Sequence, residues 1–441
     1  MNKRLTAAIL AASIGLSAFA GCSKTAESSS EASSAVSSAA STSASEFIKT
    51  PASVVKEIGD VSSEQEKAFR QGYLNFSFEL LKKNLEQDGN SSNVMVSPAS
   101  VMLALDMTAA GSADNTLLEM MALYGGDKDP QGQLSYAAKI LNRLNDSKGV
   151  SMHAADSIWV NSDVMPEGLA TDYKDFVKDY FDAQAESLVF DKAAEDKING
   201  WVKDNTDGMI PGIVDELDPT MAMMLINAIA FDGKWAKQYE DYQVEEDTFQ
   251  AASGDKQTAQ MMSGSESVYL ENDLATGFAK YYDGGQYAFV VMLPKDETQN
   301  AGDMLAGFTG DSFDQYMNSA SKSYIVRTKM PEFSYDWGRS IVPQLQAMGM
   351  KVPFVGGMAD FSGITGSHNG LFIGDVIHKT HIEVNRRGTR AAAVTAVEMF
   401  KNSVAVDDRD VKEVICDRPF AYAIVDMTDN TPVFIGTVNS I

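Results

Sequence analysis

Cysteine is almost absent from this chain of 441 residues, which contains only Cys22 and Cys416. A single possible pair cannot form a disulfide framework. Histidine is also scarce, and the four residues are His153, His368, His378 and His381. A zinc module built from Cys and His is therefore not expected, and the sequence predicts no metal and no other cofactor.

Basic residues are few relative to acidic ones. Lys and Arg number 36 and Asp and Glu number 61, which gives a net charge of −25. Such a chain cannot replace the counterions of a phosphate backbone, so nucleic acid is excluded as a partner. The acidic net charge suits a secreted or surface protein. With 44% hydrophobic residues, the chain can also bury a sizeable core.

The N-terminal residues have the pattern of a targeting signal. Lys3 and Arg4 precede an apolar run over 5–20, too short for a membrane span, and the run ends in Phe-Ala-Gly-Cys at 19–22. This ending resembles the bacterial lipobox, although Leu is usual where Phe19 stands. The resemblance predicts a lipoprotein signal peptide over 1–21 and a lipid anchor on Cys22; ordinary secretion is the alternative.

A linker is predicted after the anchor. Ser and Ala dominate residues 23–45 and form no apolar face, so residues 22–58 are interpreted as the lipidated cysteine followed by a flexible tether. The folded domain is expected over 59–441. It would then work at the cell surface or outside the cell, held to a membrane through Cys22.

Helix signals dominate the first part of this domain. Ser63-x-x-Glu66 predicts a capping box and a helix that ends near Gly89, and Ser97-Pro98 predicts the start of a second helix. Further helices are expected over 113–124, 171–183, 195–205 and 338–348. Strands are expected over 287–293, 371–377 and 382–384, with a hairpin over 420–427 and 432–438. Helices followed by strands indicate the α+β class.

The motifs of common catalytic sites are missing. There is no G-x-S-x-G elbow, Walker loop, G-x-G-x-x-G or H-E-x-x-H. His378 and His381 would lie on opposite faces of a strand, and Cys416 has no catalytic context. The sequence therefore does not predict an enzyme.

One segment has an unusual pattern. No proline occurs from Gly388 to Arg418, and one alternate set of positions, beginning with Thr389, Ala391, Ala393 and Thr395, is small and uncharged. The other set contains Arg390 and Glu398. Such a segment could bury one face as a strand, but Ala favours helices, so an exposed loop or a short helix is equally compatible with these residues.

Seven blocks in order resemble the serpin family from about residue 65 to the end. They are Asn93-Val-Met-Val-Ser-Pro-Ala-Ser100 with Ala110-Gly111 and Thr116, Ile198-Asn-x-Trp201-Val with Thr206-x-Gly208-x-Ile210, Asn227-Ala-Ile-Ala-Phe231-x-Gly-x-Trp235, Met330-Pro-Glu-Phe333, His378-Lys379 with Glu383-Val-Asn385, Gly388-Thr-x-Ala-Ala-Ala-x-Thr395, and Arg418-Pro-Phe420 with Phe434-Ile-Gly436.

The resemblance implies a fold and a mechanism. The fold has three β-sheets, about nine helices and an exposed reactive-centre loop. A serine protease, or sometimes a cysteine protease, attacks the loop and forms an acyl-enzyme. The cut loop then inserts into the central sheet and traps the protease as a covalent complex. A serpin fold without inhibitory activity, serving as a binding protein, is the alternative, and an unrelated solute-binding lipoprotein is a third.

Site residues follow from the same resemblance. Ser97, Ser100, Asn227 and His378 match the polar cluster beneath the central sheet, called the shutter, and Trp235 matches the upper end of that sheet, called the breach. The hinge corresponds to Gly388, Thr389, Ala391, Ala393 and Thr395. Counting from Gly388 puts the scissile region at Phe400, Lys401, Asn402 and Ser403, with Lys401 or Asn402 before the cut.

Two arginines depart from the family pattern. Arg386 and Arg387 stand where acidic residues usually precede the hinge glycine. The usual ion pair to a lysine in the breach is therefore not expected. Arg390 replaces a common Glu but is expected to face outward, so the inhibitory interpretation stands.

Overall fold

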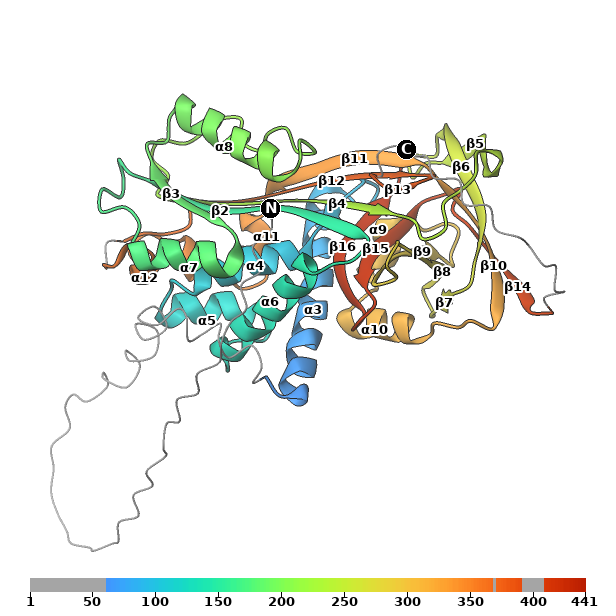
Figure 1. Ribbon diagram of the computed structural model, residues 1–441, viewed down its shortest axis with the longest axis horizontal. Coiled ribbons are helices and arrows are strands. Elements are labelled where there is room, and N and C mark those ends of the chain that lie inside the picture. Colours follow the sequence, from blue (N-terminus) through green and yellow to red (C-terminus); the bar gives the residue numbers. More distant parts are fainter. Residues whose placement is uncertain (1–60, 368–369, 391–407) are drawn as a thin grey trace, which may run out of the picture. The chain divides into compact units, whose positions relative to one another are not determined.

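The computed structural model describes residues 61–367, 370–390 and 408–441. Within these ranges it contains ten α-helices and three β-sheets (Figure 1), which confirms the expected class and the three sheets. The helices are α3 (Ser63–Asp88), α4 (Pro98–Ala109), α5 (Asp114–Ala122), α6 (Pro130–Asn145), α7 (Thr171–Phe181), α8 (Lys192–Asn205), α9 (Ala301–Ala306), α10 (Gly310–Asn318), α11 (Val342–Ala347) and α12 (Ser362–Thr365). None of the helices in these ranges combines the length and apolar character needed to cross a membrane.

The central sheet has six strands. In spatial order they are β11 (Phe333–Ser340), β12 (Asp375–Asn385), β13 (Gly388–Thr389), β4 (Met223–Lys234), β2 (Val150–Asn161) and β3 (Gln184–Leu188). Strands β12 and β4 also pair directly and in parallel, from Asp375 opposite Met224 to His381 opposite Ala230. The short strand β13 separates them only at the end beyond these pairs.

Two further sheets complete the fold. One has the order β1 (Met95–Val96), β16 (Thr431–Val438), β15 (Phe420–Asp426), β9 (Tyr287–Pro294), β8 (Ala275–Tyr281) and β7 (Tyr269–Glu271). The other has the order β14 (Asp410–Ile415), β10 (Tyr324–Pro331), β6 (Lys256–Glu266) and β5 (Val244–Gln250). Strands β15 and β16 form the C-terminal hairpin that the sequence predicts.

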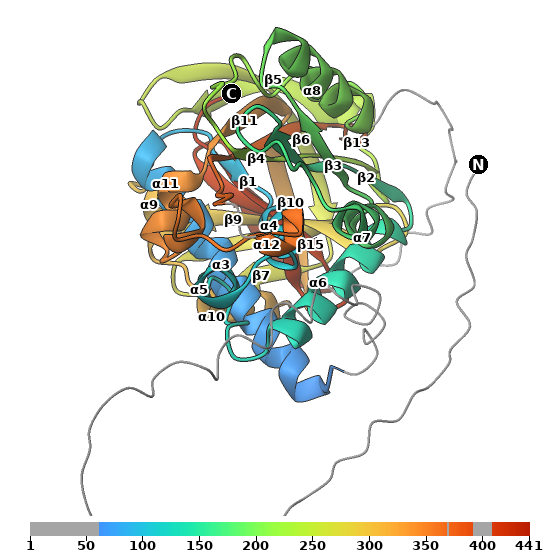
Figure 2. The ribbon, with the colours of Figure 1, turned by 90° about the vertical axis from the view of Figure 1, so that its left-hand side faces the viewer.

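The central sheet is buried on both faces. Met224, Ile226 and Ala228 of β4 pack in one apolar cluster with α8, whereas Leu225 and Ile229 belong to the larger core on the opposite face. This two-residue period follows from the pleat of a strand. Figures 1 and 2 show α8 on one side of the sheet and α3, α4 and α6 on the other.

Helix ends follow the capping signals with small shifts. The capping box of α3 is formed by Ser62 and Gln65, one residue before the predicted pair, because the side chain of Ser62 accepts from the backbone N–H of Gln65. Helix α4 begins as predicted, with Ser97 as N-cap and Pro98 at the first position.

Two predicted elements need correction, and helix α6 was not predicted. The helix expected over 338–348 is α11, which begins at Val342, because β11 runs through Ser340. The strands expected over 371–377 and 382–384 are one continuous strand that starts at Asp375. Helix α6 is present although the sequence predictions contain no helix there.

Candidate functional site

The hinge residues already form a strand inside the central sheet. Gly388 and Thr389 pair antiparallel with Asn385 and Val384 of β12 on one side, and with Lys234 and Gly233 of β4 on the other. A Cβ atom at Gly388 would collide with the carbonyl oxygen of Gly233. Glycine is therefore required where the chain first enters between the two strands.

Thr389 points into the core. It is fully buried, and its hydroxyl lies 2.7 Å from the hydroxyl of Tyr282. The Tyr282 ring stacks on Trp235 with centroids 4.6 Å apart, and Trp235 Nε1 donates to the carbonyl oxygen of Asn385 at 2.9 Å. The predicted breach residue thus contacts the hinge through Tyr282, which the sequence predictions missed.

The chain leaves the sheet at Arg390. Its backbone N–H donates to the Glu383 carbonyl at 2.7 Å, and its φ of 46° turns the chain out of strand geometry. The guanidinium reaches the carbonyl oxygen of Asp207 at 3.2 Å, so Arg390 faces away from the core, as expected. The other predicted loop residues lie outside the described residues: Ala391, Ala393, Thr395, Phe400, Lys401, Asn402 and Ser403. Cys22 does too.

The breach contains an ion pair of reversed sign. Arg386 Nε lies 2.9 Å from Glu332 Oε1, and the Arg386 backbone N–H donates to the same oxygen at 3.0 Å. The hydrogen bond to Glu332 raises the pKa of Arg386 above its ordinary value. Glu332 stands in the Met330-Pro-Glu-Phe333 block, so the missing acidic residue at 386 is matched by an acidic residue on the opposing segment.

A buried lysine lies under the same tryptophan. Lys280 Nζ pairs with Glu266 at 2.8 Å and lies 4.2 Å from the Tyr239 ring centroid and 5.4 Å from that of Trp235. Burial lowers the pKa of Lys280, and the Glu266 carboxylate opposes this shift. The Lys280 ammonium group therefore makes cation–π contacts with Trp235 and Tyr239.

The four predicted shutter residues meet at one place. Asn227 of β4 is opposite His378 on β12 in the parallel register, and its side chain donates to Ser100 Oγ at the start of α4. The backbone N–H of Ser97 donates to His378 Nε2 at 3.0 Å. The cluster thus joins two strands of the central sheet to the N-terminus of the helix beneath them.

His378 is neutral with a defined tautomer. Because Nε2 accepts from Ser97, the proton lies on Nδ1, which faces the Asn227 carbonyl oxygen at 3.3 Å. Burial lowers the pKa of His378 to about 4. As expected, His381 lies on the other face, where Nδ1 contacts Asp336 at 2.7 Å.

Asp156 belongs to this cluster although the sequence predictions missed it. It is opposite Asn227 on β2, and its Oδ1 accepts from Asn227 Nδ2. Asp156, Asn227 and His378 therefore form a row across three adjacent strands. Burial raises the pKa of Asp156 to about 7, and hydrogen bonds from Asn227 and Ser100 only partly offset that shift.

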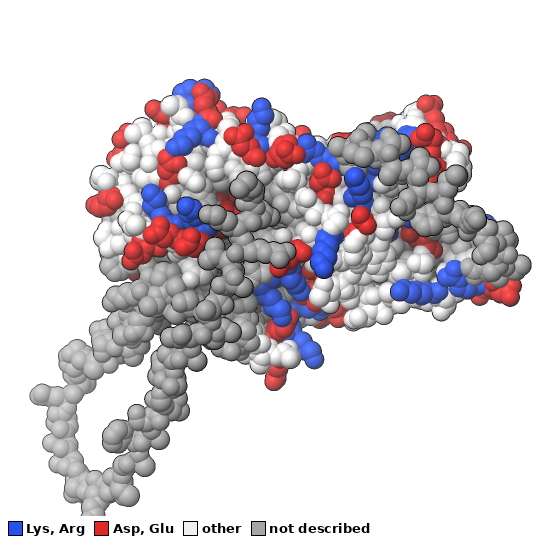
Figure 3. Space-filling view, viewed as in Figure 1, with Lys and Arg blue, Asp and Glu red and all other residues white. Residues whose placement is uncertain are grey.

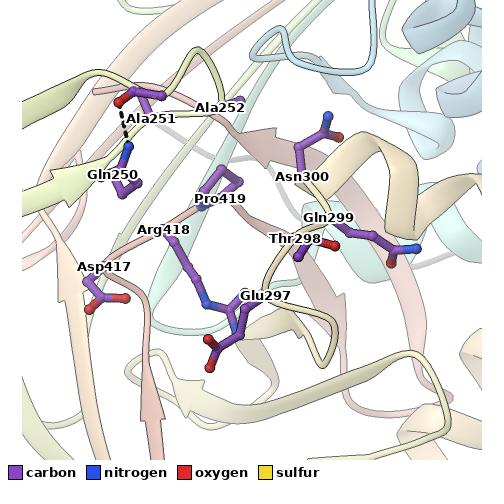
Figure 4. A pocket seen from close by; sticks show the side chains of 11 residues that line it. Gln250, Ala251, Ala252, Glu297, Thr298, Gln299, Asn300, Asp417, Arg418 and Pro419 are labelled. Atoms are coloured by element: carbon purple, nitrogen blue, oxygen red, sulfur yellow. Dashed lines mark hydrogen bonds between the residues drawn. The ribbon is translucent and has the colours of Figure 1, made fainter.

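A surface hollow lies elsewhere in the described part of the chain. It has a volume of about 500 Å³, lies by the β14–β15 connection, and has Arg418 and Glu297 among its lining residues (Figure 4). None of its lining residues is a histidine, serine or cysteine, and none belongs to the described hinge residues. No group of three His, Cys, Asp or Glu able to hold a metal occurs in the described ranges. Acidic and basic side chains are interspersed on the face shown in Figure 3.

Comparison with known proteins agrees with this geometry. Residues 71–441 match the family described as Serpin (serine protease inhibitor). An uncharacterized serpin-like protein of Thermococcus kodakarensis is 29% identical over 379 residues, which cover 84% of this chain and 85% of the relative.

Solved structures that resemble this chain are also serpins. The thermophilic serpin tengpin in its native state is 35% identical, with a TM-score of 0.76 over 85% of this chain and 94% of tengpin. Thyroxine-binding globulin in complex with thyroxine shares the fold at 22% identity, with a TM-score of 0.73 over 84% of this chain and 98% of the globulin. Serpins as a family act mainly as protease inhibitors rather than enzymes, and this chain belongs to the serpin family.

Proposed function

We propose that this serpin inhibits a serine protease by offering its reactive loop as a substrate and then inserting the cut loop into the central sheet. The observation that carries the proposal is β13, where the chain already lies between β12 and β4. Below β13 these strands pair directly, so continued insertion would replace one parallel pairing with two antiparallel ones.

The hinge chemistry supports continued insertion. Thr389 occupies a fully buried position, and the following alternate residues Ala391, Ala393 and Thr395 are small and uncharged. On insertion, none of these three side chains would bury a charge in the central sheet, and none is bulky. Arg390 and Glu398, in the other alternate set, would point to the opposite face.

The test is a protease panel. Trypsin, chymotrypsin, subtilisin and elastase are mixed with the protein and run on denaturing gels, beside the same proteases with the active serine blocked. We expect at least one covalent adduct that the blocked enzyme does not form. Cleavage by every protease without an adduct would favour a substrate-like binding protein, a role consistent with the thyroxine complex of a related fold.

The scissile bond is proposed to lie between Phe400 and Ser403. Mass spectrometry of the released C-terminal peptide should show a start at Lys401, Asn402 or Ser403, because an inserting strand needs about fourteen residues beyond Gly388. Lys401 would suit a trypsin-like pocket with a buried carboxylate. A start beyond Val406 would contradict this loop length.

We also propose that the inhibitor is anchored at a bacterial cell surface through Cys22. The support is the sequence pattern of residues 1–22 and the Ser/Ala-rich tether that follows. The wild-type chain should enter the membrane fraction and incorporate labelled palmitate. Cys22→Ser should do neither, whereas equal labelling of both would refute lipidation at this residue.

A further inference from the structure

A small cavity opens beside the shutter. It lies among α4, α6, β2, β4 and the end of α7 and has a volume of about 100 Å³. Its apolar wall consists of Leu103, Leu141, Leu144, Met152, Phe181 and Ile229. A cavity of about 150 Å³ with comparable walls admits benzene, so this one has room for a short aliphatic chain.

One end of the cavity contains the carboxyl group of Asp156. Ser100 and Asp156 line it, Asp156 Oδ1 accepts from Asn227 Nδ2, and Asp156 as a whole residue is half-buried. No Lys, Arg or His is among the lining residues. The carboxylate is held only by the Asn227 amide and the Ser100 hydroxyl. Its ionised form costs free energy there, because neither group supplies the opposite charge.

The mouth is polar and also acidic. Asn145 and Asp182 line the cavity and are exposed, and Asp182 follows α7 with a φ of 49°, its backbone N–H bonded to the Val177 carbonyl. Ala154, an exposed residue of β2, lies on the same lining. A ligand would therefore pass a polar mouth and an apolar wall before its end reached Asp156.

We propose that this cavity binds a short unbranched alkylammonium ion, with the ammonium group on Asp156 and the methylenes along the leucine-rich wall. The ammonium supplies the charge that the lining lacks and up to three hydrogen-bond donors. The wall gains contact with methylenes that would otherwise face water. A second ammonium on a diamine of matching length would reach toward Asp182.

The test is calorimetric titration of the full chain at pH 8 and 150 mM NaCl. The probes are n-butylammonium, putrescine and the uncharged n-butanol. We expect saturable binding of butylammonium, at least tenfold weaker binding of butanol, and loss of at least tenfold in affinity in Asp156→Asn. Because no protease is present, this result is independent of the proposed inhibition.

Two further variants distinguish binding in this cavity from nonspecific attraction of the cation to the acidic protein surface. Asp172→Asn removes an exposed carboxylate on α7 that does not line the cavity, and it should bind butylammonium like the wild type. Ala154→Met narrows the cavity from an exposed position and should abolish binding without removing Asp156. The proposal is overturned if Asp156→Asn binds as tightly as Asp172→Asn, or if butanol binds as tightly as butylammonium. Tighter binding of putrescine, lost in Asp182→Asn, would assign the diamine.

Discussion

Asp156 is a half-buried residue of the central sheet, and burial of its carboxyl group changes its protonation. Its folded-state pKa of about 7 lies above the ordinary 3.8, so the protonated form is favoured in the folded protein. The stabilisation of the folded state that this pKa difference contributes is fully present below pH 3.8, and it is lost as the pH rises through about 7. His378 has the opposite dependence, since its pKa falls from 6.5 to about 4 and its stability is lost as the pH falls through that range.

Asp156→Asn should therefore stabilise the protein more at pH 8 than at pH 5. The amide keeps an acceptor for Asn227 without the buried charge, and the gain in free energy of unfolding should grow by on the order of 2–3 kcal/mol between these values. Urea unfolding of both proteins at both pH values measures it. The His378 contribution is common to both proteins and cancels, so a gain that is the same at both pH values would contradict this account.

The Arg386–Glu332 pair should behave as a unit. Glu332→Lys should lower the free energy of unfolding by about 1–2 kcal/mol. It places a second positive charge beside Arg386 and removes the acceptor of the Arg386 backbone N–H. Exchange of both charges, Glu332→Lys with Arg386→Glu, should restore part of the loss. A double-mutant cycle with purely additive effects would show that the pair does not couple.

Sequence reasoning located the residues that a local pattern marks. Ser97 precedes a proline at a helix start, and Gly388 and Thr389 stand in a recognisable run. Asp156 and Tyr282 were missed because their roles come from strand register and from a stack between distant segments. Glu332 was visible in its block, but only the structure shows that it faces Arg386.

At the scale of elements, β13 is the part of the molecule on which the mechanism depends. Thr389→Arg should convert an inhibitor into a substrate, because the side chain beside Tyr282 would bury an unpaired charge. The number of inhibitor molecules consumed per protease molecule should rise at least tenfold. Arg390→Asn is the matched control, since this residue faces outward and Asn tolerates its positive φ. An equal loss of inhibition in Thr389→Arg and Arg390→Asn would contradict a specific role for the buried position.

The predicted elements show where local signals suffice. Helix α3 and the C-terminal hairpin were found because their apolar periods are long and their turns polar. Helix α6 was missed even though Asp129-Pro130 caps it as Ser97-Pro98 caps α4. The boundary between β11 and α11 was misplaced because strand pairing with β12 overrides the local helix signal at 338–340.

As a whole molecule, the intact protein is expected not to be in its most stable arrangement. Strands β4 and β12 are paired from Asp375 to His381, yet the hinge above them is already accommodated as a strand. Cleavage would free residues that can extend β13 downward in two antiparallel ladders. Each kcal/mol gained should raise the melting temperature by about 1–1.5 °C in a folded domain of this length.

The melting temperatures of loop-cleaved and intact protein show whether the cut loop enters the central sheet. Limited proteolysis within 398–403 gives the cleaved sample, which is purified with both fragments retained and heated beside the intact chain. Thr389→Arg, cleaved in the same way, serves as the control that should not gain stability. A rise of at least about 5 °C is expected for the cleaved wild type, because insertion adds several kcal/mol of new strand pairing. Equal melting temperatures for intact and cleaved wild type would contradict insertion of the loop into the central sheet.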